Sequence, residues 1–298
     1  MNGFLLIDKP TGLSSFQVLR KIDHHFHISR NGQKIGHGGT LDPEASGLLV
    51  AAIGRATRLL KYFLGSDKHY LADICLGRST TTDDATGETR QEGPWQHLSR
   101  HDVENALTQF RGTIQQIPPD FSALHVQGKR AYHLAAEGKP VHLEPRSVTI
   151  YGNTLTHCDL PVSPVISLSI ACSGGTYIRS IARDLGQALG TYAHLCALRR
   201  TQSCRFDISQ AHALNDILDH TTLDDLLLPC EKALSHFEAI QLNAHDAFEI
   251  MHGYAVDLSA YAPATYRIQC HDNPKLLAVV EIATDRTLNI TRIETDRA

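Results

Sequence analysis

The 298-residue sequence lacks the short motifs that mark most cofactor and metal enzymes. It contains no G-x-G-x-x-G turn after a strand, no Walker phosphate loop and no G-x-S-x-G nucleophile elbow. These absences argue against dinucleotide binding, nucleoside triphosphate binding and serine-hydrolase chemistry. No H-E-x-x-H pattern occurs among the 18 histidines, so we expect neither a metal nor a cofactor.

Cysteine is present but is not paired in the sequence. The seven cysteines are scattered and include no C-x-x-C, a distribution that argues against both a disulfide framework and a zinc site. We expect reduced and mostly buried thiols at Cys75, Cys158, Cys172, Cys196, Cys204, Cys230 and Cys270.

Long apolar runs are also missing. No run approaches the roughly 18 residues that a transmembrane helix needs. The first residues, MNGFLLIDKP, lack the basic start and the cleavage site of a signal peptide. We therefore predict a cytoplasmic protein without a membrane partner.

Charge is unevenly distributed along the chain, although the net charge is only −4. Residues 1–68 carry nine Lys/Arg and five Asp/Glu, whereas residues 207–298 carry six Lys/Arg and fifteen Asp/Glu. A polyanion bound to one face needs a local positive field rather than a positive total charge. A solvated basic helix face explains the first segment equally well, so both interpretations stay open at this point.

Short apolar segments alternate irregularly with amphipathic ones. Residues 4–7 predict a buried strand, and Ser14 with Gln17 makes a capping box that predicts the start of a helix. The apolar positions expected on that helix are Phe16, Leu19, Ile22 and Phe26. Most strands look antiparallel, which favours an α+β fold with a central mixed, mainly antiparallel sheet over a doubly wound fold.

We place a domain boundary near Ala239. Residues 1–238 form the expected main domain, with an excursion at about 112–145 that contains a basic Gly-Lys-Arg turn. Residues 239–298 are acidic and turn-rich and contain short strands, which predicts a small β-barrel. An extra sheet layer on the main domain is the alternative.

The stretch KIGHGGTLDPEASG, residues 34–47, places Asp42 among four glycines and directly before Pro43. Glycine permits close approach of other atoms, so we expect a tightly folded loop against which something packs, RNA backbone included. An isolated Asp-Pro most often forms a surface turn. A shielded Asp42 could instead act as a base, an electrostatic stabiliser or a covalent nucleophile.

The sequence GHGGTLDPEASGLLVAAIGRATRLLKY resembles the catalytic motif of the bacterial tRNA pseudouridine-55 synthases, the TruB-type family. LLIDKPTGLSS, GTYIRSIARDLGQALG and AHLCALRR resemble further motifs of that family, so the resemblance covers nearly the whole chain. It implies a pseudouridine synthase catalytic domain followed by a PUA-like RNA-binding β-barrel. It also implies isomerisation of uridine 55 in the T-loop of tRNA, without a metal or a cofactor.

The resemblance implies that Asp42 is the nucleophile, and it leaves open whether Asp42 attacks the ribose or the base. Tyr70, in KHY, would stack on the flipped target base, and Arg179, in GTYIRS, would pair with the catalytic carboxylate. Four further positions are assigned to substrate binding by the same resemblance: Tyr177, Leu198, His37 and Lys9.

Structural roles are open for the same positions from the residues alone. Tyr70 and Leu198 also fit a packed core, and Lys9 fits a salt bridge. The chain departs from the family pattern at RSTTTDD, where Arg-Thr-Asp-Thr is frequent, and this puts the local salt-bridge network in question. Ala278 replaces a common glycine in the acidic last domain, which predicts a weak grip on RNA.

We expect tRNA, bound through its T-stem-loop, as the partner of a monomeric protein without an obligate protein partner. The alternatives are a non-catalytic tRNA-binding chaperone and a relative of the guide-RNA-dependent pseudouridine synthases. The joint presence of Asp42, Tyr70 and Arg179 argues against a loss of catalysis.

Overall fold

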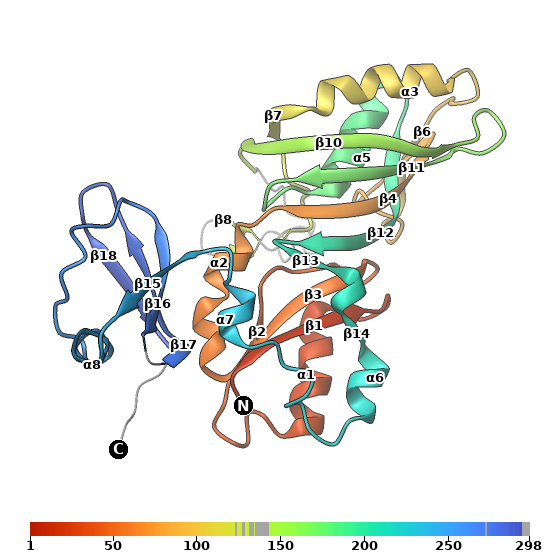
Figure 1. The fold of residues 1–298 in the computed structure, drawn as a ribbon. Helices are drawn as coiled ribbons and strands as arrows, with labels where there is room; N and C mark the ends of the chain where they lie inside the picture. Colours follow the sequence, from red (N-terminus) through yellow and green to blue (C-terminus); the bar gives the residue numbers. More distant parts are fainter. Residues whose placement is uncertain (123, 127–128, 131–133, 135–142, 272, 294–298) are drawn as a thin grey trace.

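A twisted central sheet organises the chain, and helices cover it in two separate groups (Figure 1). The computed structural model describes residues 1–298 except 123, 127–128, 131–133, 135–142, 272 and 294–298. Much of the excursion predicted at about 112–145 therefore lies outside the described residues. Its first residues belong to the central sheet instead, because β7 (Gly112–Gln116) is an edge strand of that sheet.

Ten strands of the described chain form the central sheet. Eight of them follow one another in the order β14 (His212–Ala213), β1 (Gly3–Lys9), β3 (Ser46–Ile53), β12 (Ala193–Ser203), β4 (Lys68–Leu76), β11 (Val165–Cys172), β10 (Arg146–Cys158) and β7. The other two are β13 (Phe206–Asp207), which pairs with β12, and β2 (Ile35–His37), which pairs with β3. Among the described strands of this sheet the β1–β14 and β3–β12 pairs are parallel and the others antiparallel, which confirms the predicted α+β sheet.

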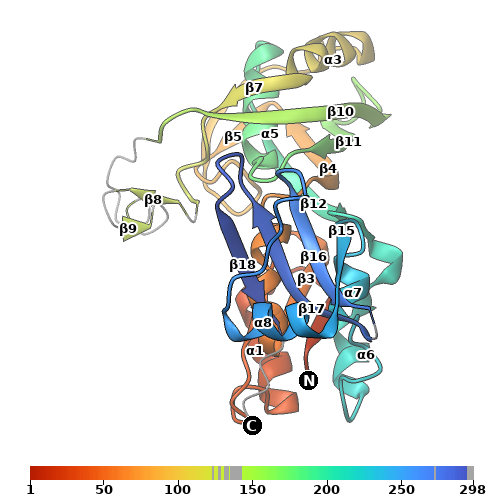
Figure 2. The same ribbon diagram turned by 60° about the vertical axis from the view of Figure 1, so that its left-hand side comes forward.

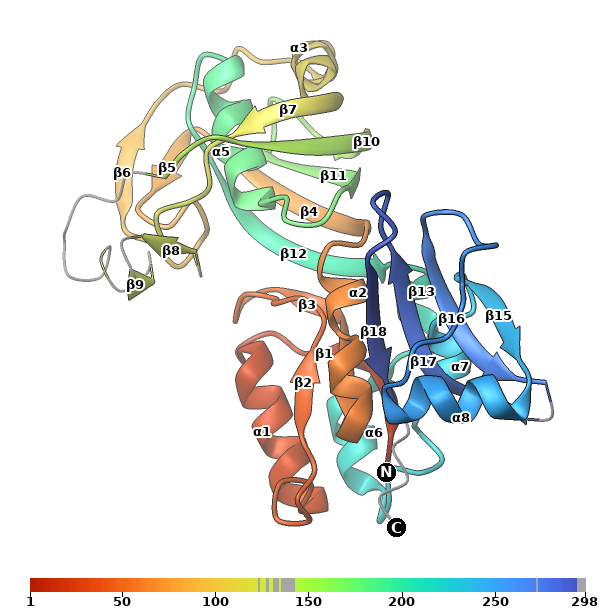
Figure 3. The ribbon, with the colours of Figure 1, turned by 90° about the vertical axis from the view of Figure 1, so that its left-hand side faces the viewer.

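The sheet has two halves that meet at β12 (Figure 3). In one half, α1 (Ser15–Phe26) and α6 (Leu214–Asp219) pack on β1 and β3 around one buried apolar cluster. In the other half, α3 (Arg100–Leu107) and α5 (Ile178–Ala188) pack on β4, β10 and β11 around a second cluster. Because β12 contacts both β3 and β4, it holds the two halves together.

Helix α1 begins as its sequence predicts. The Ser14 side chain accepts from the Gln17 backbone N–H, and the Gln17 side chain accepts from the Ser14 N–H, which completes the capping box. Its buried apolar side chains are Val18, Leu19, Ile22 and Phe26. The prediction for Phe16 is wrong, because this side chain is 66% exposed and Val18 takes its place on the buried face.

The remaining short elements lie in the connections between these strands and helices. They are the pairs β5 (Arg78–Thr80) with β6 (Thr89–Glu92) and β8 (His125–Val126) with β9 (Lys129–Arg130), the helices α2 (Lys61–Leu64) and α7 (Cys230–Ala233), and the 3-10 turns η1 (Gly54–Leu59), η2 (Thr108–Phe110) and η3 (Ile208–Gln210). Figure 2 shows β8 and β9 apart from the central sheet.

The C-terminal part forms its own sheet beside the β1–β3 half (Figures 1 and 2). The described strands run in the order β15 (Glu238–Leu242), β16 (Thr265–Cys270), β17 (Asn273–Ile282) and β18 (Leu288–Arg292), and α8 (Ala244–His252) packs on them. Over these described strands the sheet is open, so the predicted closed barrel is not confirmed. No helix in the described part of the chain is both long enough and apolar enough to cross a membrane.

Candidate active site

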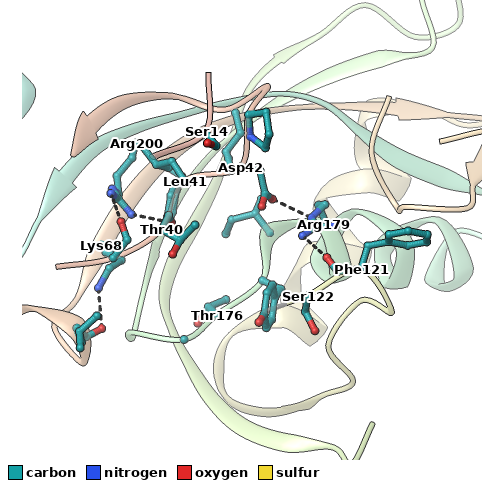
Figure 4. Close-up of a pocket in the computed structure, with 18 of the residues that line it drawn as sticks. Ser14, Thr40, Leu41, Asp42, Lys68, Phe121, Ser122, Thr176, Arg179 and Arg200 are labelled. Atoms are coloured by element: carbon teal, nitrogen blue, oxygen red, sulfur yellow. Dashed lines mark hydrogen bonds and ion pairs between the residues drawn. The ribbon is translucent and has the colours of Figure 1, made fainter. Parts of the chain in front are cut away.

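A pocket of about 640 Å³ lies where the two halves of the central sheet meet (Figure 4). The loop between β2 and β3 supplies one wall, and strands β4 and β12 and the start of α5 supply others. The charged residues and tyrosines that line the pocket are Asp42, Lys68, Tyr70, Arg146, Tyr177, Arg179 and Arg200. This volume is typical of a site for a small molecule or a single nucleotide-sized group.

Asp42 and Arg179 meet inside this pocket, as the sequence predicts. Arg179 Nε lies 3.0 Å from Asp42 Oδ2, and the Arg179 side chain is 6% exposed whereas that of Asp42 is 42% exposed. The arginine is therefore buried and the carboxylate still faces the pocket (Figure 4). A planar guanidinium held in this way fixes the orientation of the carboxylate.

Three more acceptors hold Arg179 in place. Its Nη1 donates to Thr82 O at 3.1 Å, its Nη2 donates to Phe121 O at 3.0 Å, and Asp84 Oδ2 lies 3.7 Å from Nη1. Asp84 belongs to RSTTTDD, the stretch that departs from the family pattern. Although this stretch differs from the frequent Arg-Thr-Asp-Thr, it still places a carboxylate beside Arg179.

Lys9 anchors the loop that carries Asp42. Its side chain is fully buried, and its ammonium group donates to the carbonyls of Pro10, Leu13 and Pro43. Burial lowers the pKa of the Lys9 ammonium to about 8, although the nearby Glu44 and Asp42 partly oppose this shift. Lys9 therefore fixes the residue that follows Asp42, while its own side chain is not among those that line the pocket.

Arg200 holds the other side of the same loop, and the sequence analysis did not identify it. The side chain is 1% exposed and donates to Leu48 O at 2.7 Å, to Gly39 O at 3.0 Å and to Thr40 O at 3.5 Å. Buried carbonyls need such partners, because an unpaired one costs about 1–3 kcal/mol. The only sequence signal is the arginine pair in AHLCALRR, which does not say which arginine turns inward.

Three of the four loop glycines pack tightly against other parts of the protein. A Cβ on Gly36 or Gly38 would approach side-chain atoms of Leu60 or Phe63 to 2.9 and 2.8 Å. Gly47, at φ +99°, would place a Cβ 2.3 Å from Arg200 O. Protein atoms therefore occupy the space beside these three glycines, so close packing within the protein explains them, and the approach of RNA backbone stays a prediction. Of the four glycines only Gly39 lines the pocket.

The two predicted tyrosines lie on different walls of the pocket. Tyr70, on β4, is 7% exposed, and burial raises the pKa of its phenol. Tyr177 precedes α5 and is clamped by Gln116, which accepts from the Tyr177 N–H at 2.8 Å and donates to its carbonyl at 3.0 Å. The Arg146 guanidinium lies 4.5 Å from the centre of the Tyr177 ring. Flat aromatic surfaces and cations suit a nucleotide base and its phosphates.

The structure separates the last two predicted residues. Leu198 lines the pocket and also packs against the core cluster of the α3–α5 half, so both of its suggested roles are compatible with its position. His37 is not among the lining residues, and burial lowers the pKa of its imidazole. Its Nδ1 is buried without a hydrogen-bond partner among the described residues.

Four cationic side chains line the pocket together with Asp42: Lys68, Arg146, Arg179 and Arg200. Lys68 was also missed, although it begins the KHY motif. It is 5% exposed, donates to Ser66 O at 2.6 Å, and burial lowers its pKa to about 8. The pocket combines one accessible carboxylate with positive charge and aromatic rings, which suits nucleophilic attack on an anionic, ring-containing substrate.

Two protein-family models match the chain. The N-terminal domain model of the TruB family of pseudouridylate synthases matches residues 27–178, and the tRNA pseudouridylate synthase B C-terminal domain model matches residues 179–235.

Curated relatives called tRNA pseudouridine synthase B extend this match. The relative from Pseudomonas paraeruginosa is 39% identical over 96% of this chain and 93% of its own length. The relative from Neisseria gonorrhoeae is 41% identical over 82% of this chain and 78% of its own length. The relative from Synechococcus elongatus is 40% identical over 94% of both chains.

Solved structures share the fold at lower identity. A chain in the crystal structure of a Cbf5–Nop10–Gar1 complex superposes with a TM-score of 0.71 at 24% identity, covering 99% of this chain and 84% of that one. A chain in the archaeal box H/ACA sRNP Nop10–Cbf5 complex gives 0.70 at 22% identity, with 98% and 85% covered. At these identities the likeness demonstrates a common fold.

Proposed function

This chain belongs to the TruB family of pseudouridylate synthases, and on that premise we propose that it converts uridine 55 in the T-loop of tRNA to pseudouridine with Asp42 as the nucleophile. The chain is an isomerase that forms pseudouridine from uridine in tRNA. The position of the target uridine, the nucleophile and the residues around it are our proposal.

The reaction exchanges one bond to the ribose for another. The bond between C1′ and N1 breaks, the uracil turns, C5 bonds to C1′, and a proton passes from C5 to N1. Atoms and electrons balance without an oxidant or a reductant. A carboxylate that adds to the ribose or to the base can keep the two fragments together during the turn.

One observation carries the proposal most directly. Asp42 is the carboxylate that lies 3.0 Å from the buried Arg179 and that faces a pocket with two tyrosines. Arg179 would hold the carboxylate in its reactive orientation, and the protein backbone holds Arg179. Preorganised partners of this kind need no rearrangement when the reaction occurs.

The target base must leave its stack to reach Asp42. We propose that Tyr70 stacks on the flipped base and that Tyr177 and Leu198 pack around it, because all three line the pocket. We propose that His37 touches the RNA outside the pocket. Lys9 would act indirectly, through the Pro43 carbonyl that it binds.

We extend the proposal to the organisation of the chain. Residues 1–238 would form the catalytic domain, and residues 239–298 would form a PUA-like RNA-binding domain, a boundary supported by the start of β15 at Glu238. We further propose a monomer that needs no obligate protein partner and that works on tRNA in the cytoplasm.

The test compares two acid-to-amide substitutions in the same loop. Asp42→Asn keeps the shape of the side chain and removes its negative charge, so it should bind a tRNA T-stem-loop and form no detectable pseudouridine. Glu44→Gln makes the same chemical change at an exposed position, and it should retain activity within a few-fold. Pseudouridine mapping after incubation of each purified variant with the stem-loop measures both.

Two results would contradict the proposal. Substantial pseudouridine formation by Asp42→Asn would exclude Asp42 as the nucleophile. Modification of a uridine other than position 55 by the unmodified protein would reject the proposed target and leave the nucleophile assignment intact.

A further inference from the structure

Cys75, His194 and Cys196 come together at the pairing of β4 with β12, and none of them lines the proposed catalytic pocket. Their ligand atoms lie within 4.8 Å of one another. His194 is opposite Cys75 in the strand register, and Cys196 lies where the register shifts between Leu195 and Ala197. We propose that these three side chains form a binding site for a zinc ion.

The donor set suits zinc. Two thiolates and one neutral imidazole balance the charge of Zn²⁺, and sulfur with nitrogen is the ligand combination that zinc prefers in proteins. Three protein ligands leave the fourth tetrahedral position for water. The cysteine side chains belong to half-buried residues, so an ion can reach them from solvent.

The orientation of His194 is the second observation. Its Nδ1 lies 2.9 Å from the Arg78 carbonyl oxygen, which can only accept a hydrogen bond, so Nδ1 carries the proton. The lone pair is then on Nε2, which lies 3.9 Å from Cys196 Sγ. A ligating histidine typically donates its other ring N–H to a carbonyl or carboxylate in this manner. Since the residue is only 1% exposed, the ring has little freedom to turn.

One ligand–ligand distance can be compared with that of a filled site. Zinc–sulfur bonds of about 2.3 Å and zinc–nitrogen bonds of about 2.1 Å imply a separation of about 3.6 Å between a sulfur and a nitrogen ligand. The 3.9 Å between His194 Nε2 and Cys196 Sγ is within a few tenths of an ångström of that value. For this pair of ligands a small side-chain rotation therefore suffices, and Cys75 Sγ lies within 4.8 Å of both.

Arg78 competes with the metal for the same lone pair. Its Nη2 lies 3.3 Å from His194 Nε2, and a positive charge there opposes a cation. Because Arg78 is exposed, its side chain can turn into solvent when the metal enters. This contact predicts that removal of the Arg78 charge strengthens zinc binding.

The scattered spacing of the cysteines in the sequence argues against a zinc site, but spacing along the chain does not describe these three positions. Cys75 is more than a hundred residues from His194 and Cys196, and only the strand pairing brings them together. Cys196 also borders a small cavity that it shares with Asp42 and Arg179. A bound ion would therefore stiffen β12 directly behind the catalytic pair.

The experiment uses the full chain in a non-thiol reductant and follows Co²⁺ as a spectroscopic substitute for Zn²⁺. We expect one Co²⁺ per chain with thiolate-to-metal absorption in the near ultraviolet, which Zn²⁺ abolishes by displacement, and a Zn²⁺-dependent rise in melting temperature. Cys75→Ser and Cys196→Ser should weaken binding by more than the roughly 10- to 100-fold that loss of an outer-shell partner costs. Cys158→Ser, a free cysteine on β10, is the matched control and should bind as the unmodified protein does.

Arg78→Gln changes an exposed residue and leaves all three ligands in place. It therefore tests the site even if a cysteine variant does not fold. We expect it to bind Zn²⁺ several-fold more tightly than the unmodified protein. The proposal is overturned if the unmodified protein binds no Co²⁺ with thiolate absorption. It is equally overturned if folded Cys75→Ser and Cys196→Ser bind the ion as tightly as Cys158→Ser.

Discussion

The Asp42 loop and the C-terminal sheet are attached to the same β1–β3 half by different physical means. Buried cations hold the loop, since Lys9 and Arg200 donate to its backbone carbonyls. An apolar cluster holds the sheet, with Phe4 and Leu276 among its members. We call the contact between the C-terminal sheet and the β1–β3 half the junction. The loop must hold the Asp42 carboxylate in position for the reaction, whereas the junction only has to keep the two sheets together. We therefore expect substitutions in the loop to change the reaction rate and substitutions in the junction to change stability.

The junction also engages part of the basic segment. Lys61 Nζ lies 2.6 Å from Glu281 Oε1, Arg58 donates to Arg292 O at 3.0 Å, and Arg55 donates to Ile293 O at 3.4 Å. Lys9 and Lys68, at the ends of the segment, are buried. The positive balance of residues 1–68 therefore overstates the charge that RNA could meet outside the pocket, because five of its cations already serve the fold.

The largest effect is expected at the catalytic pair. Arg179→Met should reduce the rate of pseudouridine formation by about 10²- to 10³-fold, because Asp42 loses a preorganised partner. Arg183→Met is the matched control in the same helix, since Arg183 pairs with Asp83 and Asp184 and does not contact Asp42. Single-turnover rates on a T-stem-loop measure both variants, with circular dichroism to verify folding. An equal loss in Arg183→Met would mean that helix stability, not the contact to Asp42, explains the result.

A substitution in the junction should change the free energy of unfolding and not the rate of pseudouridine formation. Leu276→Ala removes a side chain that is 1% exposed in the shared cluster, so it should lower the free energy of unfolding by about 2–5 kcal/mol. Leu288→Ala, at a residue 38% exposed on β18, should change it by less than about 0.5 kcal/mol. Urea denaturation gives the free energies, and the rate per folded molecule should stay unchanged. Similar free energies for the two variants would show that the cluster does not hold the sheet.

The loop anchor predicts a pH dependence. The pKa of Lys9 is about 8 in the folded chain and 10.5 for an ordinary lysine, so between these values the unfolded chain binds more of this proton. Stability then rises with pH across the window, and between pH 8 and 10 the unmodified protein should gain roughly 2 kcal/mol relative to Lys9→Met. Urea denaturation at several pH values measures the difference. Lys34→Met changes an exposed lysine, so its free energy of unfolding should depend on pH as that of the unmodified protein does. The same pH dependence in Lys9→Met would refute the expectation.

The smallest effect is expected at the ion pair of the junction. Lys61 and Glu281 have side chains that are 46% and 34% exposed. A double-mutant cycle with Lys61→Ala and Glu281→Ala should give a coupling of only about 0.2–1 kcal/mol, and salt should reduce it. A coupling well above that range at high salt would mean that charge, and not the apolar cluster, closes the junction.

Local patterns made much of this fold and site predictable. The capping box at Ser14 and Gln17 formed as expected, because its atoms are within one helical turn of each other. The motifs that single out Asp42, Tyr70 and Arg179 also mark side chains that line one pocket. The exposed Phe16 shows the limit of such patterns, since helical spacing alone does not say which neighbouring stripe faces the core.

By itself the sequence determined the α+β class, the helix start at Ser14 and the residues that could react, because these depend on neighbours in the chain. Only the tertiary structure decided what surrounds them. The anchoring of the Asp42 loop by Arg200 and the meeting of Cys75 with His194 both depend on which strands pair and in which register. Strand pairing joins residues far apart in the chain, and a register shift such as that between Leu195 and Ala197 determines which side chains become neighbours.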